Sequence, residues 1–422
     1  MSLTLSSADE AMRDGAEGEA VAFAMQVILA MADVQRATSL LDITHAHIDS
    51  TVYVGEATLE YAERLAAMGA QVRVPTTLNV SGLDEHGWKG WSVPPAWASK
   101  AYRQMVAYQS MGAIPTWTCA PYQTPYGRPA FGQQVAWGES NAIAFANSIL
   151  GARTERYPDL LDVCCAITGR APAAGLHLTE RRAATLEIRL VDMPRRVQDD
   201  DAFYPVLGAA LGRLAGDEVP VVVGLTARPG DDALKAVCAA AASTGAVALF
   251  HIVGVTPEAP TLEAACQGRA PSRTIALTLD DIIRERTALT TARGETLDLV
   301  ILGSPHFSFE EFRRLAPLLE GRRKAPDVRF LVTSSRFMRD LAREAGLLAS
   351  LEVFGGEVTV DTCILTTPML PATIRCLMTN SGKYAYYAPG LLGTTVTFGS
   401  LRDCVTSAER GCVDVDMTGW QA

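Results

Sequence analysis

Short apolar runs alternate with amphipathic stretches along most of the chain, which is typical of an α/β protein. In the first half, four segments have the apolar spacing of helices: residues 7–36, 57–67, 98–111 and 141–150. Four short apolar runs between them predict strands: 40–43, 72–74, 114–118 and 160–167. The first half therefore alternates helices with strands.

The alternation becomes regular from about residue 184. Eight apolar runs predict strands in this region: 184–190, 220–225, 246–253, 298–302, 328–333, 358–365, 373–378 and 394–398. Because strands buried on both faces are continuously apolar, this pattern favours mostly parallel sheets covered by helices. We expect an N-terminal α/β domain over 1–183 with the His and Cys119 loops, a central α/β domain over 184–345, and a C-terminal part over 346–422 that closes the cleft.

Size and charge narrow the class of protein. The chain has 422 residues, of which 48% are apolar and 20% charged, so it is long enough for two or three domains with large cores. Its net charge of −10 argues against nucleic acid as a partner. The pattern shows neither a membrane-spanning stretch nor a secretory signal, so we expect a cytoplasmic protein.

Unusual polar residues follow several predicted strands. Such loops run over residues 45–49, 119–123, 304–306 and 361–363, and a further polar turn runs over 380–383. In open α/β sheets, ligands bind beyond the carboxyl ends of the strands. The sequence therefore predicts that these five loops converge on one cleft.

His45 and His47 lie two residues apart at a strand end, so their side chains point the same way and suit a metal. The same pattern resembles metal-dependent hydrolases of the amidohydrolase type, for which His251 could be a further ligand. Alternatively, the two imidazoles only form hydrogen bonds within the core. Both interpretations stay open at this stage.

The chain has nine cysteines and no C-x-x-C motif. Cys164, Cys165 and Cys238 lie in apolar segments and are expected in the core. Cys119 and Cys363 differ, because each follows a predicted strand in a polar loop. Thiolates brought together from distant loops could bind an iron–sulfur cluster, although the spacing alone is weak support.

Seven motifs together resemble the large component of the aconitase X family: ITHAHIDSTVYVG, VPTTLNV, TWTCAPYQT, WGESNAIAFANSILGART, GSPHFS, VTVDTC and TNSGKYAYYAPG. The resemblance implies a multi-domain, aconitase-like large component. It also implies an iron–sulfur dehydratase that works with a small swivelling subunit. The substrate class implied is a small hydroxy acid, either cis-3-hydroxy-L-proline, dehydrated to 1-pyrroline-2-carboxylate, or mevalonate 5-phosphate.

By the same resemblance, Cys119 and Cys363 are cluster ligands, and Cys404 is the candidate for the third. Ser304 stands where the phosphomevalonate enzymes tend to have cysteine, so this chain is expected to take cis-3-hydroxy-L-proline. The cluster is expected to be [2Fe-2S], with [3Fe-4S] or [4Fe-4S] as alternatives.

For proton transfer, Ser381 next to Lys383 is the leading candidate, and His47 and His306 compete with it. The alternative is a purely structural role, in which Ser381 only caps a turn. The helix that opens at 139–141 is expected to favour an anion, although Ser140 or Asn141 could simply cap it. Ten residues are expected to bind substrate: His45, Asp49, Asn79, Tyr122, Gln123, Ser140, Asn141, Arg153, Ser304 and Asn380. A last alternative is a non-enzymatic subunit that scaffolds a partner.

Overall fold

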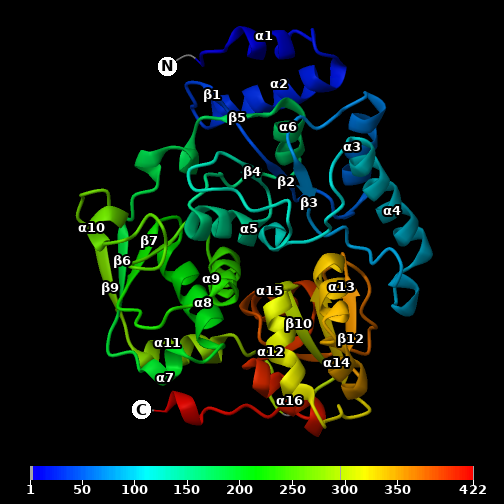
Figure 1. Cartoon of the computed structure of the whole chain (residues 1–422), viewed down its shortest axis with the longest axis vertical. Coiled ribbons are helices and arrows are strands. Elements are labelled where there is room, and N and C mark those ends of the chain that lie inside the picture. Colours follow the sequence, from blue (N-terminus) through cyan, green and yellow to red (C-terminus); the bar gives the residue numbers. More distant parts are fainter. Residues whose placement is uncertain (1–2, 295, 422) are drawn as a thin grey trace.

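The computed structural model describes residues 3–294 and 296–421, and Figure 1 shows three parts at the top, lower left and lower right. The first part has the strands β1 (Leu40–Asp42), β2 (Ala46–Ile48), β3 (Thr76–Leu78), β4 (Ala136–Trp137) and β5 (Arg170–Pro172). Its helices are α1 (Ser7–Arg13), α2 (Glu19–Val34), α3 (Glu56–Ala67), α4 (Pro95–Ser110), α5 (Ser140–Phe145) and α6 (Leu161–Thr168). Strand β2 is central in a parallel sheet of order β3-β2-β4, and β1 pairs with β5 antiparallel.

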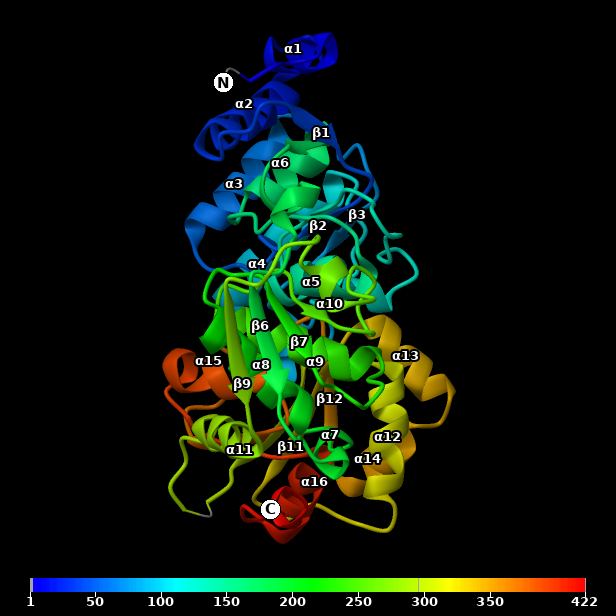
Figure 2. The same ribbon diagram turned by 90° about the vertical axis from the view of Figure 1, so that its left-hand side faces the viewer.

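The second part contains a four-stranded parallel sheet of order β8-β7-β6-β9. Its strands are β6 (Leu186–Leu190), β7 (Pro220–Val223), β8 (His251–Ile252) and β9 (Arg273–Leu277). Its helices are α7 (Arg195–Gln198), α8 (Phe203–Ala215), α9 (Asp231–Thr244), α10 (Leu262–Ala265) and α11 (Leu279–Ala288). Figures 1 and 2 together place α8 and α9 on the side of this sheet that faces the third part.

The third part contains a five-stranded parallel sheet of order β12-β11-β10-β13-β14. Its strands are β10 (Leu299–Phe307), β11 (Arg329–Ser334), β12 (Glu357–Val360), β13 (Cys376–Thr379) and β14 (Thr395–Phe398). Its helices are α12 (Phe309–Leu319), α13 (Arg336–Glu344), α14 (Leu348–Phe354), α15 (Gly382–Leu392) and α16 (Leu401–Arg410). These parallel sheets between helices confirm the predicted fold class. None of the described helices combines the length and the apolar character that a bilayer crossing requires.

The boundary expected at residue 345 is wrong, because it divides this five-stranded sheet. Strands β10 and β11 come before it, but β11 pairs with β12 and β10 pairs with β13. Backbone hydrogen bonds between parallel strands join segments that are distant in sequence, so a boundary cannot fall between them. The segment between α11 and β10 separates the second and third sheets instead.

Two predicted elements of the first part are corrected. The helix expected over 7–36 is two helices, because Gly15 and Gly18 adopt φ values of +83° and +103° that break it. The strand expected over 160–167 is helix α6, and all of its residues are buried against α2 and the β2 sheet. A short apolar run looks the same in a buried helix and a buried strand, so periodicity alone could not separate them.

Other strands were misplaced or missed. The run at 72–74 is not a strand, and β3 lies just after it. Of the run at 114–118, only Ile114 forms a bridge, to Thr77. Strand β9 was not predicted, since most of its side chains are exposed at the edge of the second sheet.

The last described segment returns from the third part to the second. Trp420 Nε1 donates a hydrogen bond to Asp200 Oδ2 at 2.6 Å, and the Arg286 guanidinium lies 4.3 Å from the centre of the Trp420 ring. This contact ties the two parts together beyond their sheet and helix packing.

We expect Gly208→Ala to destabilise the fold by about 1–3 kcal/mol, as overpacking does in well-packed cores. A Cβ at Gly208 in α8 would lie 2.5 Å from the Val237 carbonyl oxygen in α9, and backbone cannot move aside easily. Gly390→Ala in α15 is the matched control, because no atom lies within 4 Å of the added carbon. That change should be neutral or stabilise the helix by up to about 1 kcal/mol. Urea unfolding of both variants measures the difference, and equal effects would contradict the close packing.

Candidate active site

The loops after β2, β3 and β4 of the first part meet the loops after β12 and β13 of the third part. The Ser81 backbone N–H, in the loop after β3, donates to the Asp361 carbonyl at 2.8 Å. The Lys383 ammonium, at the start of α15, donates to Glu139 Oε1 at 2.5 Å. Loops from distant segments therefore meet at this junction, whereas Ser304, Asn380 and Ser381 of the predicted single cleft line another cavity.

Cys119 and Cys363 bring two free, partly exposed thiols to the junction, one from each part. Burial and the Glu139 carboxylate raise the pKa of Cys119 to about 12, whereas the Lys383 ammonium lowers it. Burial also raises the pKa of Cys363, and Lys383 again acts in the opposite direction. Both thiols thus lie in the field of the same cation, which offsets part of the effect of burial on their pKa values.

His306 connects the two cysteine loops. Its Nε2–H donates to the Thr362 carbonyl and its Nδ1 accepts from the Thr118 hydroxyl, both at 3.0 Å. Its backbone N–H also donates to Cys119 Sγ at 3.3 Å. Thr118 and Thr362 directly precede the two cysteines, so one buried imidazole sets the positions of both loops. Burial lowers the pKa of His306 to about 4, so the ring is neutral at pH 7.

Lys383 is held in a network of buried polar side chains. Burial lowers its pKa, but Glu139, Cys119 and Cys363 outweigh burial and raise the pKa above the ordinary value. Asn141 Nδ2 donates to Glu139 and, at 2.7 Å, to the Cys119 carbonyl, and Tyr122 OH donates to Asn141 Oδ1 at 2.7 Å. The lysine therefore stays charged, and the network fixes it beside the Cys119 loop.

Glu139 was not among the site residues predicted from the sequence. An anion was expected at the N-terminus of α5, and the Glu139 carboxylate itself fills that place, accepting from the Ala142 backbone N–H at 2.8 Å. Ser140 lies beside it, with its hydroxyl 3.4 Å from Glu139 Oε1. The signal available in the sequence was an acidic residue between a predicted strand and a predicted helix. An acidic residue in that position is equally typical of an ordinary helix cap.

Asp49 and Asn79 follow the adjacent strands β2 and β3. The Asn79 amide donates to Asp49 Oδ1, and the Asp49 backbone N–H donates to Asp162 Oδ2 at 2.6 Å. Burial and the neighbouring carboxylates of Glu139, Asp159 and Asp162 raise the pKa of Asp49 well above its ordinary value, while Lys383 lowers it.

His45 and His47 lie against Trp137 in the first part. Trp137 Nε1 donates to His45 Nδ1 at 3.0 Å, and His47 Nδ1 is hydrogen-bonded to the Thr77 hydroxyl at 2.8 Å. Burial lowers the pKa of His45 to about 4 and that of His47 to about 3, so both are neutral. Their Nε2 atoms are buried without a hydrogen-bond partner.

The metal-dependent hydrolase hypothesis requires further ligands near this pair. His251 does not supply one, because its Nε2 is hydrogen-bonded to the Arg182 carbonyl at 2.8 Å in another cavity. Across residues 3–294 and 296–421, no three or more His, Cys, Asp or Glu side chains are grouped to hold a metal ion. The hydrolase hypothesis is therefore abandoned.

Cys404 and Arg153 are among the predicted site residues that lie elsewhere. Cys404 is fully buried on α16, within an apolar cluster that includes Phe312 and Val405, so it is a core residue and not the third ligand. Arg153 donates to the His177 carbonyl at 3.0 Å and lines a cavity of about 230 Å³ that also contains Arg182. Its sequence position after a helix-ending glycine could not reveal which cavity it faces.

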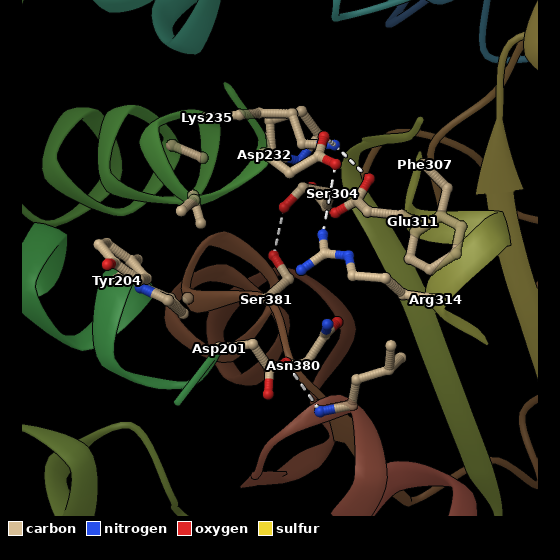
Figure 3. A pocket seen from close by; sticks show the side chains of 18 of the residues that line it. Asp201, Tyr204, Asp232, Lys235, Ser304, Phe307, Glu311, Arg314, Asn380 and Ser381 are labelled. Carbon is tan, nitrogen blue, oxygen red and sulfur yellow. Dashed lines mark hydrogen bonds and ion pairs between the residues drawn. The ribbon is translucent and has the colours of Figure 1, made fainter. Parts of the chain in front are cut away.

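Ser304, Asn380 and Ser381 line a cavity of about 140 Å³ between the second and third parts, shown in Figure 3. Ser381 caps α15, because its hydroxyl accepts from the Tyr384 backbone N–H at 3.1 Å and donates to the Ser304 carbonyl. The structural alternative for Ser381, a capping role, is thus confirmed. Figure 3 also shows Lys235 paired with Glu311, and Arg314 with Asp232, so the cations of this cavity are neutralised.

Gln123 lies beside Tyr122 in the loop after Cys119, and its Oε1 is buried without a hydrogen-bond partner. The contacts at the junction of the first and third parts bring Asp49, Asn79, Cys119, Cys363 and Lys383 together in one site.

Three protein-family models match the chain: Aconitase X first domain over residues 2–180, second domain over 184–287 and third domain over 297–410. The cis-3-hydroxy-L-proline dehydratase of Pseudomonas aeruginosa is 46% identical over 99% of this chain and 72% of its own length. The phosphomevalonate dehydratase large subunit of Methanothermobacter thermautotrophicus is 37% identical over 93% of this chain and 96% of its own length. The crystal structure of Thermococcus kodakaraensis aconitase X in its holo-form has a TM-score of 0.86 and 30% identity, covering 96% of this chain and 100% of that chain.

Proposed function

The chain belongs to the aconitase X family, and from this premise we propose that it is a hydro-lyase that dehydrates cis-3-hydroxy-L-proline to 1-pyrroline-2-carboxylate. The relatives with that activity in their names are more similar to it than those named phosphomevalonate dehydratase. Because the relatives are dehydratases, the hypothesis of a non-enzymatic scaffold has no support.

The observation that carries the choice of substrate is the charge around the two thiols. Among the described side chains there, Lys383 is the cation that acts on Cys119, Cys363 and Asp49, and it is already paired with Glu139. Mevalonate 5-phosphate brings a carboxylate and a phosphate, which require several cations. Hydroxyproline is a zwitterion without net charge, so it suits a site with one cation and several carboxylates.

We propose that Cys119 and Cys363 hold the iron–sulfur cluster that aconitase-type dehydratases generally use. Two free thiols under the field of Lys383 are a suitable donor set for part of such a cluster. Two cysteines supply only part of the four ligands that either a [2Fe-2S] or a [4Fe-4S] cluster ordinarily has, and we keep the [2Fe-2S] cluster expected from the family resemblance. When bound, an iron with an open coordination position supplies Lewis-acid chemistry for the departure of the C3 hydroxyl.

The chain's own residues orient the substrate and stabilise developing charge. The Lys383 ammonium donates to the substrate carboxylate, where negative charge grows as the C2 proton leaves. Glu139 and Asn141 keep Lys383 in place before the reaction, so little reorganisation is needed. His306 holds the two cysteine loops at a constant separation through Thr118 and Thr362.

Two of the three candidates for the base have their proton-accepting atoms engaged, and the third, His47, keeps an unpaired Nε2 but is a weak base because burial lowers its pKa to about 3. The Ser381 hydroxyl caps α15, the His306 nitrogens are both bonded, and His47 is fully buried. We therefore assign His306 and Ser381 positioning roles and leave the base outside these three side chains.

Several relatives are named large subunits, which implies a small partner subunit. We propose that the partner is a swivelling domain that closes over the junction of the first and third parts. We also expect the enzyme to work in the cytoplasm, where cysteine ligands stay reduced.

We expect the complete enzyme, prepared anaerobically with its small subunit, to turn over cis-3-hydroxy-L-proline at least about 100-fold faster than the trans isomer or mevalonate 5-phosphate. In the cis isomer the C2 hydrogen lies on the ring face opposite the hydroxyl, so the hydroxyl and the proton can leave from opposite sides. Elimination first yields an enamine, which rearranges to the cyclic imine. The imine is followed with 2-aminobenzaldehyde, and loss of water by mass spectrometry. Faster turnover of the trans isomer would contradict the two-sided geometry, and turnover of mevalonate 5-phosphate alone would contradict the substrate.

A further inference from the structure

We propose that Asp49 and Asn79 bind the ring nitrogen of the substrate, and that this pair makes the site select a cyclic amino acid over a hydroxy acid without nitrogen. This inference rests on the proposed function and assigns a role within the same site. It concerns specificity and does not depend on the cluster.

The two side chains reach the site from neighbouring parallel strands. Ile48 and Leu78 are register partners in β2 and β3, so Asp49 and Asn79 are the next residues along each strand. The Asn79 backbone N–H donates to the Ile48 carbonyl at 2.9 Å, and the Asn79 amide donates to Asp49 Oδ1. The strand pairing therefore fixes the pair before any ligand arrives.

Each of the two residues presents a hydrogen-bond acceptor that the described part of the chain does not use. Asn79 is 4% exposed, and its Oδ1 has no hydrogen-bond partner. Asp49 is partly exposed, and among the described residues its carboxylate accepts a hydrogen bond through Oδ1 alone. The buried Asn79 Oδ1 left unpaired costs about 1–3 kcal/mol. Together with the partly exposed Asp49 oxygen beside it, this acceptor suits a ligand that brings N–H donors.

The charges around Asp49 also favour a ligand that carries a positively charged N–H group. Glu139, Asp159 and Asp162 surround it with further negative charge, and Lys383 is the cation that opposes them. Lys383 already pairs with Glu139, so Asp49 has no cation of its own. A carboxylate among other negative charges and without a counter-charge is stabilised when a ligand ammonium supplies one.

The chemistry of cis-3-hydroxy-L-proline matches this arrangement. Its ring nitrogen is a secondary ammonium with two N–H donors, one for each free acceptor. The nitrogen and the carboxylate are both attached to C2, so the groups that recognise them must be neighbours. Asp49 and Lys383 meet this condition, because Gly138 packs against Asp49, with 2.8 Å from a Cβ added at Gly138 to the Asp49 Cβ, and its neighbour Glu139 pairs with Lys383.

The test compares two inhibitors that differ in the ring nitrogen, L-proline and cyclopentanecarboxylate. Inhibition constants are measured against cis-3-hydroxy-L-proline for the complete wild-type enzyme and for Asp49→Asn. We expect the wild type to bind L-proline at least about 10-fold more tightly, as a charge-assisted hydrogen bond provides. In Asp49→Asn this preference should fall to about 3-fold or less, and KM should rise more than kcat falls.

Asn79→Leu is the second variant, since it removes the other acceptor without changing charge, and it should reduce the preference in part. Asp42→Asn is the matched control, because Asp42 lies on the exposed end of β1 and pairs with Arg170. It should leave the preference unchanged. Binding of both inhibitors is also measured by calorimetry, so the comparison does not require turnover.

A wild-type enzyme without a preference for L-proline would overturn the inference, as would an Asp49→Asn enzyme that keeps the full preference. If the wild type turns over cis-3-hydroxy-L-proline in either case, the proposed function stands and this assignment alone is wrong. If the wild type dehydrates none of the hydroxyprolines, the proposed function is wrong, whatever the inhibitors show.

Discussion

Replacing Cys119 or Cys363 by serine is expected to abolish most of the bound iron and to lower kcat by at least about 10³-fold. The physical reason is that a Lewis-acidic metal contributes several kcal/mol to the departure of a poor leaving group, and each 1.36 kcal/mol corresponds to a factor of ten. Serine keeps the size of the side chain but has a far less acidic hydroxyl, so it is a poor iron ligand. Iron content and the visible charge-transfer absorption are measured on anaerobically purified protein together with turnover.

Cys376→Ser is the matched control for these variants. Cys376 is also a partly exposed free thiol, but it lies at the start of β13, where its sulfur accepts a hydrogen bond from the Thr395 hydroxyl at 3.3 Å. Iron and activity should stay at the wild-type level in this variant. Full iron and full activity in Cys119→Ser or Cys363→Ser would show that the changed cysteine is not a ligand.

Replacing Lys383 by methionine is expected to destabilise the protein by about 3–5 kcal/mol and to lower kcat by about 10²–10³-fold. The Lys383 and Glu139 side chains are 15% and 4% exposed, so the variant leaves a buried carboxylate without its cation. The loss of rate has a separate cause, because the same ammonium is proposed to bind the substrate carboxylate. Thermal or urea unfolding and steady-state kinetics measure the two effects independently.

The double variant Lys383→Met/Glu139→Gln separates these two causes. It removes the uncompensated charge while the amide oxygen can still cap α5, so most of the stability should return but the activity should not. Lys100→Met is a control for a surface pair, since Lys100 and Glu56 are 40% and 55% exposed, and its stability should change by at most about 1 kcal/mol. Recovery of activity in the double variant would mean that Lys383 acts only through the stability of the fold.

The loops that we propose to carry the chemistry could be selected from the sequence because each combines a local signal with a general rule. Cys119 and Cys363 differ from the other cysteines in following strands with polar neighbours, and ligands gather at the carboxyl ends of parallel strands. The predictions for Cys404, taken from the resemblance, and for Arg153 do not agree with the structure. Each has a polar neighbourhood in sequence, but the face of a helix or loop that a side chain takes depends on what packs against it.

Ion pairs and hydrogen bonds between side chains of different domains could not be predicted from the sequence. The contact of Lys383 with Glu139 joins residues 244 positions apart, and His306 bridges two loops from different domains. Nothing local distinguishes Glu139 from an ordinary helix cap, or His306 from a catalytic imidazole. In the folded chain the first becomes the partner of a buried cation, and the second has both nitrogens engaged.

The sequence by itself determined the alternation of helices and strands, the α/β class and the family, because these depend on periodicity and on motifs that are contiguous in the chain. Only the tertiary structure decided which polar side chains meet, that residue 345 lies within one sheet, and that Asp49 remains without a cation. Hydrophobic periodicity is a property of neighbouring residues, whereas the charge balance of a site is the sum of groups delivered by separate domains. That sum follows from the packing of the three sheets and is not encoded in any one segment.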